Sequence, residues 1–273
     1  RMPGLLPALN DAEAIETAAI DSVLGQSIDA SRWRSRPFRA PHHTASAVAL
    51  VGGGTDPRPG EISRAHNGVL FLDELAEFSR HVLEVLREPL ESGRITISRA
   101  SGQADFPARF QLIAAMNPCP CGYLGDRHGD CRCSAEAVRR YRGKISGPLL
   151  DRIDIHIEVQ RPAVAALRPN AAGGEDSATV AARVAAARAM QEQRAGKSNA
   201  DLSSAELDTY YVADSASLAL LEKAATQLPL SARAYQRVQR VSQTVADLAG
   251  ARVVSVRHMA EALGMRQLDP KSG

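Results

Sequence analysis

The sequence has almost no net charge, no hydrophobic run long enough to cross a membrane, and no charged-then-apolar leader at its start. Its 273 residues carry a formal net charge of +2, so any contact with a nucleic acid must come from local basic patches. The missing apolar runs argue against a transmembrane helix, and we expect a cytoplasmic protein. The length favours two domains, and 44% hydrophobic with 23% charged residues is typical of globular proteins.

Cysteine is scarce as well, and all of it lies in one short loop. Cys119 and Cys121 form one C-x-C pair, and Cys131 and Cys133 form a second. Four thiolates with glycines between the pairs suit one tetrahedral Zn²⁺, with His128 as a spare ligand. Such a site is structural, because four thiolates leave no position open for a substrate. Two alternatives stay open: disulfides, which a reducing cytosol disfavours, and four free thiols.

A Gly-rich phosphate loop is absent from the sequence. Gly196-Lys197-Ser198 is similar to the end of such a loop, but position 191 holds Gln where the loop requires Gly. The segment also follows a predicted helix and not a strand. We therefore reject it as a phosphate-binding loop.

The strongest positive signal is the stretch GVLFLDELAEF, residues 68–78. Val69–Leu72 is an unbroken apolar run, which predicts a strand buried on both faces of a parallel sheet. Asp73 and Glu74 follow at its carboxyl end, where such sheets bind ligands. This is the pattern of a Walker B element, in which the first carboxylate holds Mg²⁺ and the second orients the attacking water. The alternative is that Asp73 only caps the following helix.

The segments after this stretch continue the alternation of helix and strand. Residues 79–89 are predicted to be a helix that Pro89 stops. Arg94–Ser98 is predicted to open a hairpin, and Ala108–Asn117 to form a further strand. Asn117 at the tip of a central strand can hydrogen-bond a γ-phosphate or the attacking water. The alternative is a turn-forming Asn-Pro pair.

Two basic segments stand out. The first combines four arginines with two histidines: Arg32, Arg34, Arg36, Arg39, His42 and His43. A phosphate-facing patch and a solvated loop explain it equally well. The glycines and prolines of residues 52–60, which follow, predict irregular structure. The second segment is the run Arg139, Arg140, Arg142 and Lys144.

Arg152 precedes Ile153–Val159, whose alternating apolar residues predict a strand. Arg152 is either an ordinary ion-pair partner of Asp151 or Asp154, or a finger that reaches the phosphate of a neighbouring subunit. The sequence alone supports both.

The rest of the chain is predicted to be helical. Residues 161–173 are rich in Pro, Ala and Gly and indicate a boundary, and a long Ala-rich helix is expected over Glu175–Arg194. Ser231 and Ser255 are predicted helix caps in a small bundle. We therefore expect an α/β core with a parallel sheet over residues 1–160, a linker and long helix over 161–202, and a helical domain over 203–273.

Three segments, GEISRAHNGVLFLDELAEF, AAMNPCPCGY and SGPLLDRIDIHIEV, occur in this order. They closely resemble the magnesium-chelatase-like AAA+ ATPases, in the YifB/ComM competence-protein branch, over nearly the whole chain. The resemblance implies that Asp73 and Glu74 are Walker B, that Asn117 is sensor 1 and that Arg152 is the arginine finger. It also implies that Arg233, in LSARA, is sensor 2.

The resemblance further implies a hexameric ring with ATP and Mg²⁺ at subunit interfaces, a helical lid over 203–273, and DNA as the translocated polymer. The hairpin of residues 94–110 resembles the pre-sensor-1 insertion, and the loop of residues 40–60 resembles the helix-2 insertion, both of which face the ring pore in related proteins. The implied DNA-binding candidates are Arg36, Arg39, His42, His43, Arg94 and Arg99. The helix of residues 175–194 resembles the insertion before sensor 2 that moves the lid.

The sequence departs from the family in lacking a Walker A loop upstream of RMPGLL and a Lon-like N-terminal domain. We expect this chain to be part of a longer protein, and by itself neither to bind ATP tightly nor to hydrolyse it. We also expect an exposed sheet edge, because the strand before that loop is missing. Two alternative functions are a magnesium-chelatase-type motor subunit and a non-catalytic, zinc-stabilised DNA-binding or interaction module.

Overall fold

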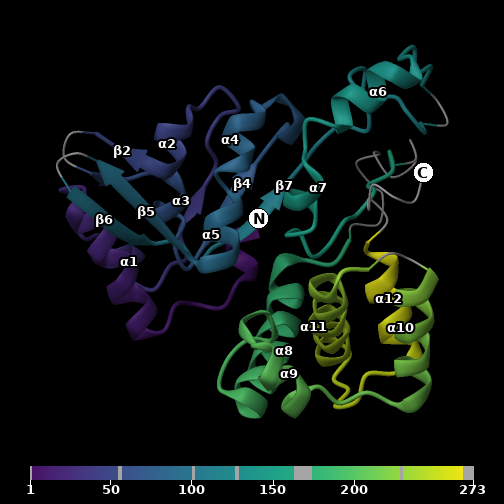
Figure 1. The fold of residues 1–273 in the computed structure, drawn as a ribbon. Coiled ribbons are helices and arrows are strands. Elements are labelled where there is room, and N and C mark those ends of the chain that lie inside the picture. Colours follow the sequence, from purple (N-terminus) through teal and green to yellow (C-terminus); the bar gives the residue numbers. More distant parts are fainter. Residues whose placement is uncertain are drawn as a thin grey trace. The chain divides into compact units, whose positions relative to one another are not determined.

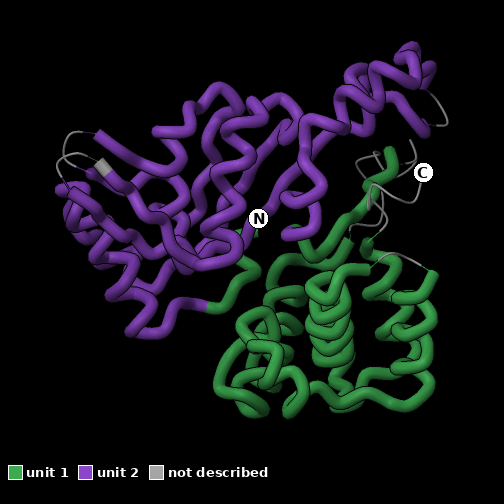
Figure 2. The backbone as a smooth tube through the Cα atoms, in the orientation of Figure 1, with its two compact units in different colours: residues 1–7, 153–273 green, residues 8–152 purple. Residues whose placement is uncertain are grey.

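The computed structural model describes residues 2–54, 57–99, 102–126, 129–162, 174–227 and 230–266, with the backbone alone at Arg99. The chain divides into two compact units (Figure 2). We call Ala8–Arg152 the sheet unit, and Arg1–Pro7 with Ile153–Gly273 the helical unit. Most of the predicted linker, residues 163–173, and the end of the predicted lid, residues 267–273, lie outside the described residues.

A parallel sheet forms the centre of the sheet unit (Figure 1). Its strands are β1 (Phe38–Arg39), β4 (Val69–Leu72) and β7 (Gln111–Ala114), in the order β1-β4-β7. β4 pairs in parallel with both neighbours. Three of the four side chains of β4 are buried, because β4 is the middle strand and both of its faces are covered. The predicted buried strand and the α/β fold class are confirmed.

A separate hairpin consists of β5 (Arg94–Arg99) and β6 (Gly102–Pro107), which pair antiparallel over their full length. Ile95 and Ile97, on one face of β5, are buried in the core of the sheet unit. This alternation places the other face of the strand toward solvent. The hairpin predicted to begin at residue 94 is confirmed.

The remaining elements of the sheet unit are short. They are α1 (Asp11–Val23), η2 (Ala30–Arg32), α2 (Ala47–Val51), β2 (Gly52–Gly53), β3 (Arg58–Pro59), α3 (Glu61–Arg64), η3 (Leu75–Glu77), α4 (Arg80–Glu84), α5 (Arg87–Ser92), α6 (Ala135–Arg142) and α7 (Gly147–Leu150), where η marks a 3₁₀ helix. Asn10 and Glu13 form a capping box that starts α1. The core contains large apolar side chains from several elements, including Leu50, Ile62, Leu70, Leu72, Phe78, Leu83, Leu86, Ile97 and Leu149.

Two local predictions in this unit are wrong. Pro89 does not stop a single helix over 79–89, because the chain forms α4 and then α5, with Pro89 in the first turn of α5. Proline fits there because the first backbone N–H groups of a helix have no partner within it. Residues 52–60 are also not wholly irregular, since β2 and β3 pair antiparallel. Gly52 has φ 103°, and a Cβ there would lie 2.1 Å from the Arg58 carbonyl oxygen, so only glycine fits.

The helical unit is built from seven helices in its described residues: η1 (Met2–Leu5), α8 (Ser177–Ala195), η5 (Asn199–Asp201), α9 (Ser204–Tyr210), α10 (Ser215–Gln227), α11 (Ala232–Leu248) and α12 (Val256–Gly264). Ser231 caps α11, with its hydroxyl oxygen accepting a hydrogen bond from the Ala234 N–H, and Ser255 is the N-cap residue of α12. The long helix and both predicted caps are confirmed. The described part of the chain contains no helix with the length and apolarity needed to cross a membrane.

Gly196 ends α8 in a left-handed conformation, with φ 70°. Lys197 then pairs with Glu206, the two charged atoms lying 2.8 Å apart. Gly196 therefore ends one helix and Lys197 contacts the first turn of the next, and the prediction that this segment follows a helix is confirmed.

The strand predicted over Ile153–Val159 is wrong. Within the described residues this segment forms one isolated bridge, between His156 and Arg266, and no ladder. Ile157 and Val159 are 67% and 88% exposed. An alternating pattern makes a strand only where a neighbouring strand supplies hydrogen-bond partners, and the described chain brings none to this segment.

Candidate functional site

The candidate catalytic carboxylates lie at the carboxyl end of the central strand. Asp73 and Glu74 follow β4 directly, and Asn117 follows β7, the parallel neighbour of β4. The Ala115 N–H donates to the Leu72 carbonyl oxygen at 3.0 Å, just beyond the last paired residues. The two loops therefore leave the sheet side by side, at the edge where parallel sheets bind ligands.

Glu74 has a left-handed backbone, with φ 52° and ψ 47°. For a residue other than glycine this conformation costs about 1–2 kcal/mol. The Asp73 carboxylate accepts a hydrogen bond from the Glu74 N–H at 2.9 Å, which supports the turn. The cap position of the following helix, η3, belongs to Glu74 and has no side-chain cap, so the alternative in which Asp73 caps that helix is wrong. Both carboxylates are exposed.

His43 holds the Glu74 side chain. Its Nδ1 lies 2.9 Å from the Glu74 carboxylate. The ring of His43 lies tilted by 34° against that of His42, with ring centroids 4.1 Å apart, and meets Phe78 edge to face at 6.4 Å. The sequence analysis assigned both histidines to a DNA-binding patch and missed this contact. The signal was their position, because they follow β1, whose carboxyl end lies at the same sheet edge as Asp73.

Asn117 is exposed, and the residue after it contacts α6, because Arg142 donates to the Pro118 carbonyl oxygen at 3.1 Å. Burial raises the pKa of Tyr141, the residue of α6 before Arg142, with the nearby Glu77 carboxylate adding to that rise. Tyr141 is itself buried. The chain directly after Asn117 is therefore attached to a distant helix through its backbone.

Arg152 pairs with an acidic side chain that the sequence analysis did not consider. Its guanidinium pairs with Glu91 and donates to the Pro148 carbonyl oxygen at 2.8 Å, and the side chain is 12% exposed. Asp154 pairs instead with Arg237. For Arg152 to reach a neighbouring subunit, the Glu91 contact must open.

Arg233 lies in the first turn of α11 and is exposed. It belongs to the helical unit, whereas Asp73 and Asn117 belong to the sheet unit. Its proposed role as sensor 2 remains a prediction.

The arginines of the first basic segment make contacts within the sheet unit. Arg36 donates to the Asn67 carbonyl oxygen at 2.7 Å. Arg39 pairs with Glu61 through two hydrogen bonds of 2.6 and 2.8 Å. Each guanidinium already neutralises or satisfies a partner of the same chain, so a phosphate would compete with an existing contact.

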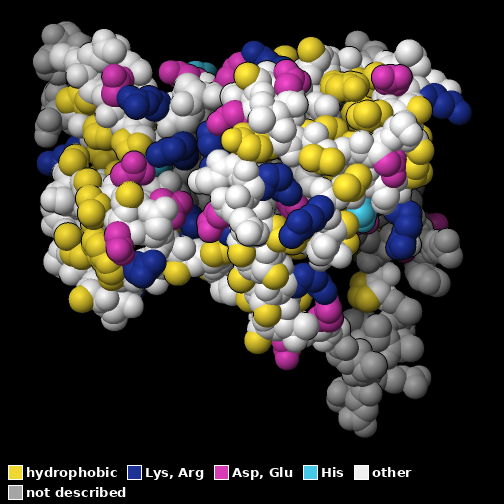
Figure 3. Space-filling view, turned by 90° about the horizontal axis from the view of Figure 1, so that it is seen from below, with side chains coloured by type: hydrophobic (Ala, Val, Ile, Leu, Met, Phe, Trp, Pro, Cys, Tyr) yellow, Lys and Arg dark blue, Asp and Glu magenta, His cyan; other side chains and the backbone are white. Residues whose placement is uncertain are grey.

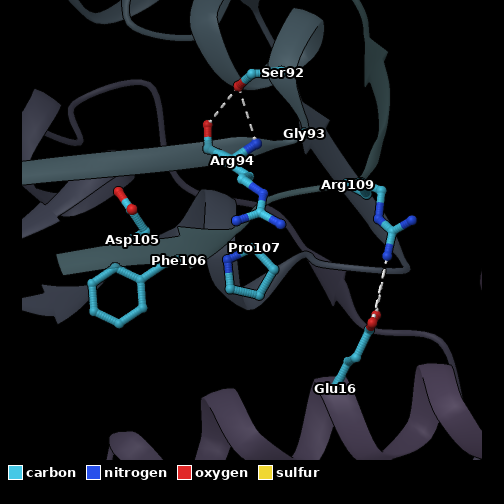
Figure 4. Close-up of a pocket in the computed structure, with 8 residues that line it drawn as sticks. All are labelled: Glu16, Ser92, Gly93, Arg94, Asp105, Phe106, Pro107 and Arg109. Carbon is cyan, nitrogen blue, oxygen red and sulfur yellow. Dashed lines mark hydrogen bonds and ion pairs between the residues drawn. The ribbon is translucent and has the colours of Figure 1, made fainter.

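Arg94 lines a cavity of about 370 Å³ at the base of the hairpin (Figure 4). Arg109 reaches across it to Glu16 on α1, at 3.3 Å. Asp105 also lines the cavity, so two guanidinium groups face two carboxylates and the local charge is balanced. On the face drawn in Figure 3, basic and acidic side chains are likewise interspersed. The side chain of Arg99 lies outside the described residues.

The four cysteines converge. Their sulfur atoms all lie within 4.8 Å of one another, and three of the separations are 3.4, 3.6 and 3.7 Å. A disulfide needs about 2.05 Å, so the disulfide alternative is wrong and the thiols are free. Zn–S bonds of about 2.3 Å in a tetrahedron place sulfurs about 3.8 Å apart, which these positions nearly match.

The four thiols influence the protonation of one another. The Tyr123 backbone N–H lowers the pKa of Cys121 to about 6, whereas the neighbouring Cys121 thiol and burial raise the pKa of Cys131 and of Cys133. The donor set and the spacing fit Zn²⁺. His128, the spare ligand considered from the sequence, lies outside the described residues.

Comparison with known families decides the classification. The model for magnesium chelatase, subunit ChlI, matches residues 1–167, and the model for the ChlI C-terminal region matches residues 174–266. The chain belongs to the magnesium-chelatase ChlI family. The resemblance inferred from the sequence is confirmed, and the family's AAA+ arrangement agrees with a parallel sheet followed by a helical lid region.

Individual relatives place the chain in the competence-protein branch of the family. It is 51% identical over 268 residues to the competence protein ComM of Haemophilus influenzae, covering 98% of this chain and 52% of that protein. It is 47% identical over 269 residues to YifB of Escherichia coli, covering 98% and 53%. The magnesium-chelatase 38 kDa subunit of Acidiphilium rubrum is 29% identical over 114 residues, covering 42% and 27%. The chain thus spans about half the length of the ComM and YifB relatives that it matches.

Proposed function

We propose that this chain is the core of an ATP-dependent AAA+ motor of the ComM branch. The observation that carries the proposal is the shared strand edge, where Asp73, Glu74 and Asn117 follow the parallel neighbours β4 and β7. The contact between His43 and Glu74 adds to it, because it holds the second carboxylate in a defined place.

In this proposal Asp73 holds Mg²⁺, which bridges the β- and γ-phosphates of ATP and neutralises their charge. Glu74 orients and polarises the attacking water, and Asn117 contacts the water or the γ-phosphate. Arg152 comes from the neighbouring subunit of a hexameric ring and stabilises the transition state, an effect of about 10³–10⁵ in rate in other phosphoryl-transfer systems. Arg233 acts as sensor 2 from the lid.

The chain alone lacks a Gly-rich cradle for the phosphates. We therefore propose that the 273-residue chain neither binds ATP tightly nor hydrolyses it, and that catalysis needs a protein of the length of its relatives. Detectable turnover by the purified chain would contradict this.

The proposed substrate is DNA, moved during recombination or natural transformation in the cytoplasm. The support is the likeness to a competence protein, together with the basic side chains of the sheet unit. Of the candidate contacts, Arg94 is exposed, whereas Arg36 and Arg39 would first have to leave their internal partners. Zn²⁺ in the four-cysteine loop is proposed as a structural element, since four thiolates leave no catalytic position.

Two other functions would fit parts of the molecule. A magnesium-chelatase-type motor subunit fits the family, but the relative of that name covers 42% of the chain, against 98% for the competence protein. A non-catalytic, zinc-stabilised DNA-binding module fits the cysteine cluster, but it leaves the contact between His43 and Glu74 without a purpose.

The test is ATP hydrolysis by the full-length protein that contains this chain, with and without single-stranded and branched DNA. Glu74→Gln keeps the size of the side chain and removes its charge, so hydrolysis should fall at least a hundredfold. Glu136→Gln, an exposed carboxylate on α6, is the matched control and should leave the rate unchanged.

The outcomes separate the three functions. DNA stimulation that disappears in Glu74→Gln supports the DNA motor. Hydrolysis that is indifferent to DNA supports the chelatase-type motor, to be followed by a binding assay with chelatase subunits. No hydrolysis, with nucleotide-independent DNA binding, supports the non-catalytic module.

A further inference from the structure

We propose that Glu91 is a positioning residue for Arg152, and that it holds the guanidinium back until a nucleotide phosphate from a neighbouring copy takes the place of its carboxylate. The inference rests on the proposed function, in which Arg152 is the arginine finger. The pair of Glu91 with Arg152 is an observation of the structure. Glu91 therefore restrains the finger in the free chain and sets how readily it reaches the reaction.

Arg152 is the last residue of the sheet unit and is anchored to α7. Its backbone N–H donates to the Leu149 carbonyl oxygen at 2.9 Å, and Leu149 is fully buried in the core. Its guanidinium donates to the Pro148 carbonyl oxygen at 2.8 Å and also pairs with Glu91. The Arg152 side chain is 12% exposed. The guanidinium is therefore folded back on its own helix.

Glu91 belongs to α5, whose end has a defined conformation. The Ser92 hydroxyl donates to the Arg94 carbonyl oxygen at 3.0 Å, just beyond the helix. Gly93 ends the helix in a left-handed conformation, with φ 68°. The Glu91 side chain is 46% exposed, much more than that of Arg152. The carboxylate is therefore held in place by its helix while remaining open to solvent on one side.

A hollow of about 490 Å³ lies beside the pair. It is lined by Glu84, Arg87, Glu88, Glu91, Ser92 and Arg152. Arg87 is paired with Glu84 at 2.7 Å, so this second guanidinium of the hollow already has a carboxylate partner. The hollow leaves room for the Arg152 side chain to turn away from Glu91 without any change in the apolar core.

A phosphate is a stronger partner for Arg152 than one carboxylate. Both anions accept paired hydrogen bonds from a guanidinium, but a terminal phosphate group carries a charge of about −2 at neutral pH and a carboxylate carries −1. A ligand shifts an equilibrium between two states only through its different affinity for them. Glu91 therefore keeps the finger back when no phosphate is near, and yields it when one is.

The first test measures the pair in the 273-residue chain without nucleotide. Phenylglyoxal modifies accessible arginines, and peptide mass spectrometry gives the rate at Arg152 relative to Arg140, whose side chain is 75% exposed. Glu91→Gln should raise this relative rate about threefold or more, because the guanidinium loses a carboxylate partner. Glu88→Gln removes a charge from the same hollow and should leave the rate unchanged. Equal rates in the wild type and in Glu91→Gln would overturn the proposal.

The second test uses ATP hydrolysis by the full-length protein. Glu91→Gln should raise kcat about threefold or more and leave KM nearly unchanged, because a larger fraction of Arg152 is available to the transition state. Glu91→Asp retains the charge and should stay close to the wild type. A merely structural role of Glu91 predicts a loss of activity, so a kcat that falls or stays constant in Glu91→Gln contradicts the positioning role.

A double variant separates this inference from the proposed function. Arg152→Gln alone should lower kcat about a thousandfold or more, and adding Glu91→Gln should then change nothing further. If Arg152→Gln leaves hydrolysis unchanged, Arg152 is no finger, and the proposed function of this residue fails together with its regulation. If Arg152→Gln is inactive but Glu91→Gln changes neither the modification rate nor kcat, the positioning role of Glu91 alone fails.

Discussion

The sheet unit and the helical unit bury different kinds of side chain. The core of the sheet unit is apolar, with Leu70 and Phe78 fully enclosed among other apolar residues. The helical unit has a smaller apolar cluster around Leu221 and Met259, and beside it a buried polar network. One unit is therefore stabilised mainly by removing apolar surface from water, and the other also depends on the exact pairing of charges.

The polar network centres on Asp247 of α11, whose side chain is 0% exposed. Arg194, near the end of α8, donates to both of its carboxylate oxygens, at 2.8 and 2.7 Å. Asn199 of η5 donates to it at 2.8 Å. The network joins the long helix α8 to α11, the helix that carries Arg233.

The two units should therefore tolerate different amino-acid substitutions. An apolar core accepts side chains of similar volume at modest cost, because its contacts are non-directional. A buried ion pair is specific, since removing one partner leaves the other charged and without compensation. The orientation of α11 relative to α8 therefore depends on a few polar atoms, whereas the structure of the sheet unit depends on many apolar contacts.

The largest effect is expected for Asp247→Ala. It leaves the partly buried Arg194 guanidinium without its carboxylate partner and should lower the free energy of unfolding of the helical unit by about 3–5 kcal/mol. Denaturant unfolding followed by circular dichroism measures it. Glu175→Ala is the matched control, because that carboxylate forms an exposed pair with Arg183 and should cost about 0–1 kcal/mol. Equal losses in the two variants would remove the distinction between the units.

Leu70→Ala should have the next largest effect. Leu70 lies in the middle of β4 and is fully buried, so the cavity should cost about 2–5 kcal/mol in the sheet unit. Leu70→Met, which conserves volume, should cost less than about 1.5 kcal/mol, as expected of a non-directional core. Ile15→Ala on α1, where the side chain is 61% exposed, provides the surface control. A Met variant as unstable as the Ala variant would contradict the contrast with the helical unit.

The smallest expected effect concerns His66, a buried polar group of the sheet unit. Its Nε2 lies 3.0 Å from Glu16 and its Nδ1 accepts from the Arg109 N–H at 3.0 Å, which fits the neutral ring. Burial lowers the pKa of His66 below its ordinary 6.5. The unfolded chain therefore binds the proton more readily, and stability should be complete above pH 6.5 and fall as the pH drops below it, by at most about 1.4 kcal/mol per unit.

Unfolding at pH 7.5 and pH 5.5 tests this dependence. His66→Gln keeps a hydrogen-bonding side chain but does not titrate, so it should remove part of the pH dependence between these values. An unchanged slope in the variant would assign the effect to other groups.

Much of the local structure followed from sequence patterns, while several of the important contacts did not. The run Val69–Leu72 predicted a buried parallel strand, and Ser231 marked a helix start, because both signals act over a few residues. The strand predicted over Ile153–Val159 failed for the opposite reason, since its pattern needed a distant partner. Likewise Pro89 is compatible with two helix boundaries, and only the packing around α4 and α5 selects one.

The candidate site likewise combines features that the sequence predicts with contacts that it does not. Local sequence patterns are enough to indicate that Asp73 and Glu74 end a buried strand, that Asn117 follows another strand, and that four thiols lie in one loop. The contacts of Glu74 with His43, of Arg152 with Glu91, and of Arg142 with the Pro118 carbonyl oxygen depend on the tertiary structure. The reason is physical: strand and cap signals arise from neighbouring residues, whereas these pairs lie far apart in the sequence and meet only because parallel strands and packed helices bring them to one edge.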